Sequence, residues 1–398
     1  MANVLVDESV LQNTADFIRS QLRTTDKFKP GVFSEKLNDV AERNDSLLDG
    51  TATEIYNDRI SKLKTNAFRD DTSLININLP EVITVEANAF YGSKVLENVN
   101  LPKATTLGDY AFFMADSLIN INLPEVTTIG IWTFAKYTGE SIRTVSLPKL
   151  TTINATSIFY NSSGPFKVYL PELSAINSTS TFSNCSGLTE LSLPKLTVFG
   201  NYFCQNCTGL SSLSLPMLTS ISGISAFKGC TALTTVDLPE LTSIAGNDAF
   251  RDCKSLTSLV LPKLTTINAT SVFYNCTSLT SISLPVLTNM YMPSGFYSCT
   301  NLKTINLPVL QTAGTNMYNM FYNCSALIDV MLGESSISVD ISFAQSPLLS
   351  DNSIQNIINA LKDLTGSTSK KLTLHSTTYA KLTEEQLAAI TNKNWKVA

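Results

Sequence analysis

A Leu-Pro dipeptide that returns at a nearly fixed interval constrains this chain more than any other feature. Successive pairs are 22 to 24 residues apart, and a degenerate copy, Leu332-Gly333, follows 25 residues after the last one. The leucines of the pairs are Leu79, Leu101, Leu123, Leu147, Leu170, Leu193, Leu215, Leu238, Leu261, Leu284 and Leu307. A period in the low twenties indicates a solenoid, because one such unit cannot bury its own apolar face and must stack on neighbours. We therefore expect one elongated stack over residues 51–333, although 398 residues would otherwise suggest two or three globular domains.

The unit that starts at Phe250 shows how one coil should fold. Leu259 and Leu261 alternate with Ser258 and Val260, which should point to the opposite side, and this period of two predicts a short strand. Pro262 should end the strand, because proline has no N–H for a ladder of parallel strands. We expect about twelve coils, with a column of phenylalanines stacked inside them. These phenylalanines are Phe68, Phe90, Phe112, Phe134, Phe159, Phe182, Phe227, Phe250, Phe273, Phe296 and Phe321.

Both ends of the chain depart from the repeat. Residues 1–50 predict a small helical module, with one helix after Asp7 and a shorter one after Pro30-Gly31. The solenoid should occupy residues 51–346, and an α/β cap should occupy residues 347–398. Within the cap we expect a helix near Ser353 to Leu364, ended by Gly366, a strand at Lys371 to His375, and a helix from Thr383 with Gln386 completing a capping box.

The repeat pattern Phe-x-x-Cys-x-x-Leu-x-x-Ile/Leu-x-Leu-Pro-x-Leu-Thr-x-Ile resembles the BspA-like leucine-rich repeats of bacterial surface proteins, over roughly residues 51–333. The two ends resemble the flanks of repeat proteins carried by bacteriophages and prophages of gut Firmicutes. The segments are DESVLQNTADFIRSQL, KFKPGVFSEKLNDV and IINALKDLTGSTSKKLTLHSTTYAKLTEEQLAAITNKNWKVA. This resemblance implies a virion-associated or tail-region protein, assembled in the host cytoplasm, whose residues 1–50 dock to other virion proteins.

Composition argues against several other classes of protein. Residues 1–10 have neither the basic start nor the apolar core of a signal peptide, and no apolar run is long enough to span a membrane. With 28 Lys+Arg against 33 Asp+Glu and no basic run, nucleic acid is not an expected partner. A single histidine, His375, leaves almost no material for histidine-based catalysis or metal binding. We expect no enzyme activity, no metal site and no cofactor; Glu190 and Asp237 should lie about two coils apart on an open sheet.

Seven of the eight cysteines recur at one position of successive coils, three residues after the ring phenylalanine or its replacement. They are Cys185, Cys207, Cys230, Cys253, Cys276, Cys299 and Cys324. A buried, reduced thiol packs as a small apolar group, so we expect an inert column. Occasional disulfides or metal capture are the alternative. Cys204 makes a C-x-x-C with Cys207, but it falls where other coils have the ring phenylalanine, so this motif is interpreted as accidental.

Charged and polar residues also keep fixed positions in the repeat. The residue after each Leu-Pro pair runs Glu81, Lys103, Glu125, Lys149, Glu172, Lys195 and, after Met217, Glu240 and Lys263. Neighbouring coils should therefore pair opposite charges, which contributes little energy but opposes a slip of one coil. The outward strand positions are mostly Asn and Ser, broken by Lys167, Tyr169, Glu190 and Asp237. This composition predicts a solvated face without aromatic or arginine anchors.

Tyrosines gather in the C-terminal third of the repeats. Tyr274, Tyr297 and Tyr322 follow the ring phenylalanine in three consecutive coils, and the loops add Tyr291 and Tyr318. The same loops carry Met290, Met292, Met317 and Met320. Directed outward, these side chains would form a patch able to stack on sugar rings or to anchor a protein partner. Alternatively, they cover the bend into the cap.

The leading hypothesis is a non-enzymatic phage virion protein that displays the solenoid for binding a host-surface glycan or protein. The tyrosines Tyr274, Tyr291, Tyr297, Tyr318 and Tyr322 are its candidate binding residues. A rigid structural spacer of about 50 Å, from about eleven intervals of ~4.8 Å, is one alternative. A bacterial surface adhesin exported by a non-classical route is another. The sequence is compatible with a homo-oligomer.

Overall fold

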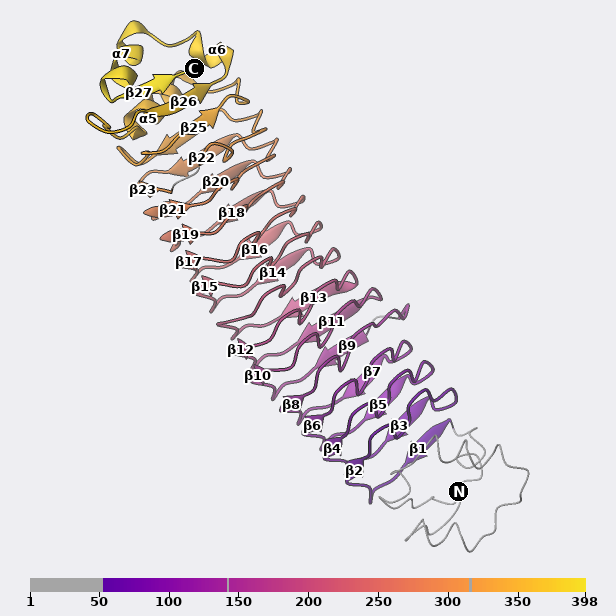
Figure 1. The fold of residues 1–398 in the computed structure, drawn as a ribbon. Coiled ribbons are helices and arrows are strands. Elements are labelled where there is room, and N and C mark those ends of the chain that lie inside the picture. Colours follow the sequence, from indigo (N-terminus) through magenta and orange to yellow (C-terminus); the bar gives the residue numbers. More distant parts are fainter. Residues whose placement is uncertain (1–52, 142, 315–316) are drawn as a thin grey trace, which may run out of the picture. The chain divides into compact units, whose positions relative to one another are not determined.

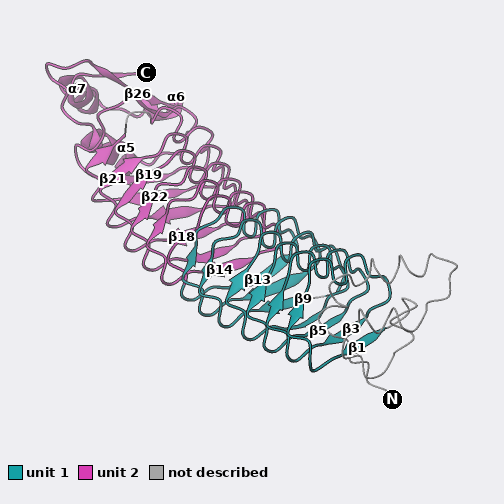
Figure 2. Ribbon diagram, turned by 60° about the horizontal axis from the view of Figure 1, so that its bottom comes forward, with its two compact units in different colours: residues 1–195 teal, residues 196–398 magenta. Residues whose placement is uncertain are grey.

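The computed structural model describes residues 53–141, 143–314 and 317–398, and the chain divides into two compact units, residues 1–195 and 196–398 (Figures 1 and 2). Each unit is built from coils that carry one strand before the Leu-Pro turn and a second short strand after it. Tight turns around the ring phenylalanine complete each coil. The predicted solenoid of parallel strands is thus confirmed within each unit. The predicted helical module at residues 1–50 lies outside the described residues.

In the unit of residues 1–195, two sets of parallel strands run along the coils. The first set comprises β1 (Glu54–Tyr56), β3 (Asn76–Asn78), β5 (Asn98–Asn100) and β7 (Asn120–Asn122), and then β9 (Arg143–Ser146), β11 (Phe166–Tyr169) and β13 (Leu188–Ser192). The second set comprises β2 (Lys62–Leu63), β4 (Thr84–Val85), β6 (Thr106–Leu107) and β8 (Thr128–Ile129), and then β10 (Thr152–Ile153) and β12 (Ala175–Ile176). The register joins equivalent residues, as in Ile77 opposite Val99, so each buried position stacks on its equivalent.

The unit of residues 196–398 repeats this arrangement. Its first set of strands comprises β14 (Ser212–Ser214), β16 (Thr235–Asp237), β18 (Ser258–Val260), β20 (Ser281–Ser283), β22 (Thr304–Leu307) and β24 (Asp329–Leu332). Its second set comprises β15 (Ser220–Ile221), β17 (Ser243–Ile244), β19 (Thr266–Asn268), β21 (Asn289–Tyr291) and β23 (Thr312–Ala313). The strand predicted around Leu259 is β18, which ends before Pro262 because proline cannot continue the ladder.

The turns around the ring phenylalanine form a third side of each coil, here called the turn side. From the coil of Phe68 to that of Phe296, the residues two before and two after the ring position have positive φ. In the coil of Phe90, for example, the N–H groups of Asn88, Phe90 and Gly92 each donate to a carbonyl of the next coil at 2.8 Å. The turn side is therefore a third backbone ladder. Its left-handed positions favour Asn, Asp and Gly, which tolerate positive φ.

The ring phenylalanines are buried and stacked, as predicted. Centroids of neighbouring rings lie 5.0 to 5.6 Å apart from Phe68 to Phe182. In the other unit they lie 4.9 to 6.0 Å apart from Phe227 to Phe343, so the column extends into the cap. These parallel rings form the centre of each unit's core.

The cysteine column is buried, and its thiols have a structural function. The Sγ of Cys253, for example, donates to the carbonyl of Phe227 in the preceding coil at 3.2 Å. The equivalent bond of Cys230 goes to the carbonyl of Cys204, which confirms that Cys204 takes the ring position in its coil. The displaced ring of Phe203 packs edge-on against Phe227 instead, at 86°. Neither residue of the C-x-x-C motif is exposed, and both belong to the core.

These thiols should be nearly unreactive in the folded chain. Burial raises the pKa of Cys276 and of Cys324 to about 12. Titration with a thiol reagent at neutral pH should therefore be slow before unfolding and should reach all eight cysteines after it. Since the folded state binds these protons more tightly, stability should fall as pH rises from about 9 towards 12. Fast reaction of the folded chain, or fewer than eight thiols after unfolding, would contradict a buried, reduced column.

The exposed charges after the Leu-Pro turns pair between neighbouring coils as predicted. Each lysine binds the glutamate one coil earlier. The pairs are Lys103 with Glu81, Lys149 with Glu125, Lys195 with Glu172 and Lys263 with Glu240. Because these pairs are solvent-exposed, each contributes no more than about 1 kcal/mol, and their main effect is on the register of the coils.

An α/β cap closes the unit of residues 196–398 at its C-terminal end (Figure 1). Its elements are β25 (Ile341–Phe343), α5 (Asp351–Ala360), β26 (Lys370–Leu374), α6 (Ser376–Tyr379), α7 (Glu384–Asn392) and β27 (Trp395–Val397), and its sheet order is β25-β26-β27. The two predicted helices and the predicted strand correspond to α5, α7 and β26, whereas α6 and β27 were not expected. The first helix ends at Ala360, before the expected Gly366, because Leu361 pairs with Ile337 in a parallel bridge.

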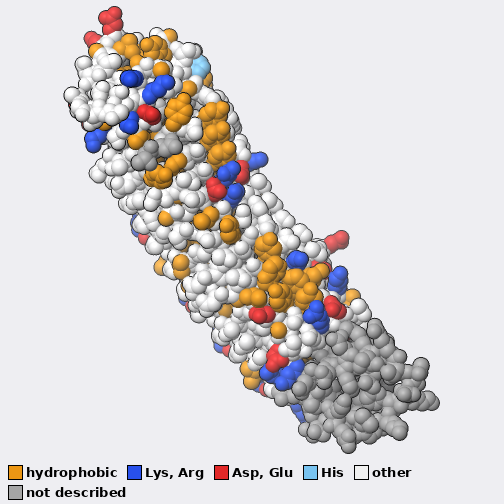
Figure 3. All heavy atoms as spheres, viewed as in Figure 1, with side chains coloured by type: hydrophobic (Ala, Val, Ile, Leu, Met, Phe, Trp, Pro, Cys, Tyr) orange, Lys and Arg blue, Asp and Glu red, His pale blue; other side chains and the backbone are white. Residues whose placement is uncertain are grey.

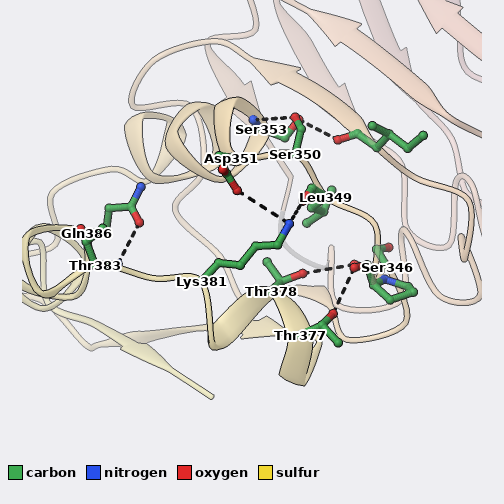
Figure 4. Close-up of polar contacts among 12 residues, drawn as sticks. Ser346, Leu349, Ser350, Asp351, Ser353, Thr377, Thr378, Lys381, Thr383 and Gln386 are labelled. Carbon is green, nitrogen blue, oxygen red and sulfur yellow. Dashed lines mark hydrogen bonds and ion pairs between the residues drawn. The ribbon is translucent and has the colours of Figure 1, made fainter.

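Side-chain caps fix the helices of this cap (Figure 4). The predicted capping box of α7 is confirmed: Thr383 accepts from the N–H of Gln386, and the Gln386 side chain accepts from the N–H of Thr383. The ammonium of Lys381, between α6 and α7, holds the start of α5. It donates to the Leu349 carbonyl at 3.1 Å and lies 3.7 Å from the Asp351 carboxylate. Among the described residues, no helix has both the length and the apolar character needed to cross a membrane.

Candidate functional site

Three of the five predicted tyrosines form a continuous stack on the turn side. Tyr274, Tyr297 and Tyr322, here called the tyrosine stack, have ring centroids 4.7 and 4.6 Å apart and planes within 14° of each other. The guanidinium of Arg251 lies 4.2 Å from the centroid of Tyr274 and covers the other end of the column. These residues share the position that follows the ring phenylalanine, so the coil repeat itself brings them together.

Tyr274 and Tyr297 present ring edges and hydroxyl groups, not ring faces. Tyr297 has another tyrosine ring against each of its faces, and Tyr274 lies between Arg251 and Tyr297. Desolvation and the neighbouring hydroxyls of Tyr322 and Tyr274 raise the pKa of Tyr297. The hydroxyls therefore lie close together in a row. Sugar rings stack on aromatic faces, so this geometry disfavours the predicted sugar stacking at Tyr297 and favours contacts through edges and hydroxyls.

The other two predicted tyrosines lie apart from the stack. Tyr291 is the last residue of β21, in the second strand set, and Tyr318 lies in the turn before Phe321. Both are exposed, but no ring contact joins either to the stack in the described part of the chain. Of the two alternatives for the loop methionines, an outward thioether patch is excluded, because all four side chains are buried. Met290, for example, pairs in register with the core residue Ile267 and takes its inward direction.

A second group of aromatic residues occupies the turn side of the other unit and was not predicted. Tyr91, Tyr110, Phe113, Trp132 and Tyr160, here called the aromatic cluster, are linked by ring contacts of 4.9 to 6.5 Å. Figure 3 shows hydrophobic side chains gathered on each unit, with charged groups beside them. The signal was present in the sequence, since Tyr91, Phe113 and Tyr160 follow ring phenylalanines just as the stacked tyrosines do.

The outward face of the first strand set is polar and bonded to itself. Over β1, β3, β5 and β7 it forms a shallow groove of about 600 Å³. The amide of Asn100 donates to Asn78 at 2.7 Å, and that of Asn122 donates to Asn100 at 2.6 Å. Neighbouring side chains therefore satisfy each other's hydrogen-bonding groups. A parallel ladder runs through Asn76, Asn98 and Asn120. These ladders agree with the predicted solvated face.

Two charged residues on this otherwise polar face, Lys167 and Glu190, also bond to each other. Lys167 lies 3.0 Å from Glu190, and hydrogen bonds from Tyr169 and Lys167 lower the pKa of Glu190. This lowered pKa keeps Glu190 ionised, which makes it a poor general acid.

His375, the single histidine of the chain, caps α6 by accepting from the N–H of Thr377. Within residues 53–141, 143–314 and 317–398, no group of three or more His, Cys, Asp or Glu residues could hold a metal ion.

Comparison with known protein families gives a match along most of the chain. A family model described as the BspA type leucine-rich repeat region, in six copies, matches residues 51–165, 105–234, 156–271, 197–328 and 243–373. The family that matches is one of repeat scaffolds, and no catalytic family is indicated. A comparison with curated proteins finds no match.

Solved structures with similar folds are also leucine-rich repeat proteins. One from Bacteroides ovatus is 22% identical, with a TM-score of 0.53 and a match that covers 76% of this chain and 82% of that one. Another, from Eubacterium ventriosum, is 16% identical, with a TM-score of 0.39 and coverage of 75% and 77%. The first of these supports the fold described above.

Proposed function

We propose that this chain, which belongs to the BspA-type leucine-rich repeat family, is a non-enzymatic, virion-associated protein of a bacteriophage that displays its coils for binding at the host surface. Leucine-rich repeat scaffolds suit protein binding and surface display, and their partners are commonly proteins. The virion role is supported by the resemblance of both chain ends to phage repeat proteins. In this proposal residues 1–50 contact other virion proteins.

The single observation that carries the binding role is the tyrosine stack. Its rings are ordered by each other and by Arg251, so little side-chain freedom is lost when a partner binds. Tyr322, at the far end, is 42% exposed. Tyrosine and arginine are the residues that most often carry interface energy, and a row of hydroxyls can bond to the backbone and polar side chains of a protein. We therefore favour a host-surface protein as the partner of this site.

A paired substitution tests this role. Tyr297→Ser with Tyr322→Ser should weaken binding of the purified full chain to host cells about tenfold, because the ring edges and hydroxyls are lost. Serine fits this position, since Ser183 follows the ring phenylalanine of another coil. Binding is measured by flow cytometry with labelled protein. Treating the cells with a protease beforehand should abolish it if the partner is a protein.

Tyr202→Ser is the matched control. Tyr202 is 38% exposed, in the same unit, at a left-handed position where Ser225 and Ser271 stand in other coils. Its substitution should leave binding unchanged. Equal binding by the double variant would remove the tyrosine stack from the proposal. Failure of the parent chain to bind any host cell would favour the structural spacer.

A further inference from the structure

The aromatic cluster differs from the tyrosine stack in the way its rings are turned. Tyr91 and Phe113 stack with planes 21° apart, as in the tyrosine stack. Tyr110, however, stands at 72° to Phe113, while its plane lies within 19° of Trp132 at a centroid distance of 6.3 Å. Tyr110 and Trp132 thus form a pair of similarly oriented rings in successive coils, crossed to the Tyr91–Phe113 column. Both are part-exposed.

The backbone at these two residues disfavours large side chains. Tyr110 has φ 57° and Trp132 has φ 56°, in the left-handed region. In neighbouring coils the same position holds Asn66, Asn88 and Ser157, which accept this conformation more readily. Bulky residues at positive φ are uncommon and concentrate at functional sites. The turn needs only a small polar residue, so the rings of Tyr110 and Trp132 require a separate explanation.

Charged groups of both signs border the cluster. The guanidinium of Arg69 lies 4.3 Å from the Tyr91 centroid, and the ammonium of Lys136 lies 5.6 Å from that of Phe113. Asp70 pairs with Arg69, at 3.4 Å. Asp109, adjacent to Tyr110, is exposed and accepts the N–H of Ile131 through Oδ1 at 2.9 Å. A polyanion would meet these carboxylates, so the charge pattern fits an uncharged ligand that carries many hydroxyl groups.

We propose that the aromatic cluster is a binding site for a neutral oligosaccharide. The rings of Tyr110 and Trp132 overlap less than those of the tyrosine stack, because their centroids lie 6.3 Å apart against 4.6 and 4.7 Å there. Sugar rings lie across the uncovered parts of these two faces, because the C–H groups of a pyranose pack on aromatic faces, and the Asp109 carboxylate accepts a sugar hydroxyl. This site belongs to the unit of residues 1–195 and does not depend on the tyrosine stack, which we assign to a protein partner. The two proposals can therefore fail separately.

Tryptophan fluorescence gives a direct readout, because the chain has only two tryptophans. Trp395 is 2% exposed and donates Nε1–H to the Lys362 carbonyl at 2.8 Å. In a full-length Trp395→Phe chain, Trp132 is the sole reporter. Titration with cellohexaose and with chitohexaose should shift its emission to shorter wavelength and protect it from acrylamide quenching, to saturation, with at least one of them. Polyphosphate should do neither.

A second pair of variants separates binding from folding. Tyr110→Asn with Trp132→Asn should lower oligosaccharide affinity at least tenfold by calorimetry, while melting is unchanged or higher, since Asn66 and Asn88 already serve this position. The Tyr297→Ser, Tyr322→Ser chain is the control and should bind the sugar normally. The proposal is overturned if neither sugar perturbs Trp132, or if the asparagine variant binds equally well. A lowered melting temperature with unchanged binding would also contradict the proposal, because it would mean that the cluster only stabilises the fold.

Discussion

Replacing Phe250 by alanine should lower the free energy of unfolding by about 3 to 5 kcal/mol. Phe250 is fully buried between the rings of Phe227 and Phe273, at 5.2 and 5.7 Å. The cavity cannot collapse readily, because the N–H of Phe250 is tied to the Val272 carbonyl of the next coil at 2.8 Å. Urea unfolding followed by circular dichroism measures the loss.

The control for this substitution lies in the same coil. Val260 is 69% exposed on β18, and Val260→Thr should change stability by less than about 0.5 kcal/mol. Because repeat proteins unfold through neighbouring units, the alanine variant should also broaden the transition. A loss below about 1 kcal/mol would mean that the ring column does not form the core.

Replacing Arg143 by methionine should raise stability, by about 1 to 3 kcal/mol. Arg143 is fully buried in β9, and two of its guanidinium nitrogens, Nε and Nη1, have no hydrogen-bond partner among the described residues. Burial lowers its pKa to about 10, although the charge interactions with Tyr137 and Asp116 oppose this shift. Methionine keeps the apolar length of the side chain and removes a buried charge that is poorly compensated.

Arg143 does make some favourable contacts, and these limit the gain. Its guanidinium carbon lies 4.0 Å from the centroid of Tyr137, and Nη2 donates to the Phe134 carbonyl at 3.1 Å. In later coils a thiol of the following coil donates to this carbonyl, but Ser162, which holds that position here, donates to the Phe159 carbonyl at 2.9 Å, and Arg143 supplies the donor to Phe134 instead. Arg143→Ala should instead lower stability, since it also leaves a cavity. If methionine proves destabilising in urea unfolding, the contacts with Tyr137 and Phe134 outweigh the desolvation cost.

The repeat made the coil and its core predictable from sequence. The interval between Leu-Pro pairs implied stacked coils, and the recurring phenylalanine implied a buried ring column such as that from Phe227 to Phe321. The capping box of Thr383 and Gln386 was predictable for a similar reason, because a helix start needs those two side chains at that spacing. In each case one short pattern determines one local structure.

The direction in which a loop side chain points could not be predicted from the repeat. The pattern placed Tyr291 near Tyr297, but Tyr291 belongs to the second strand set and faces elsewhere. The methionines lay beside tyrosines in the sequence, yet their unbranched side chains fill the core. Arg143 supplies the donor to the Phe134 carbonyl from a strand position, and no single position of the repeat signals this bond. The aromatic cluster combines two repeat positions, the residue after the ring phenylalanine and the residue two before it, so neither position alone reveals it.

In the function proposed above, this chain is part of a phage particle and is displayed on it. Particles released from bacteria that carry the gene can be purified by density gradient and digested for mass spectrometry, with and without mild surface proteolysis beforehand. If the chain is displayed on the particle, peptides from the whole chain should be found in the purified particles and should be lost selectively after surface proteolysis. Absence of the chain from the particles, together with its recovery from the bacterial surface, would contradict the virion role and support the adhesin.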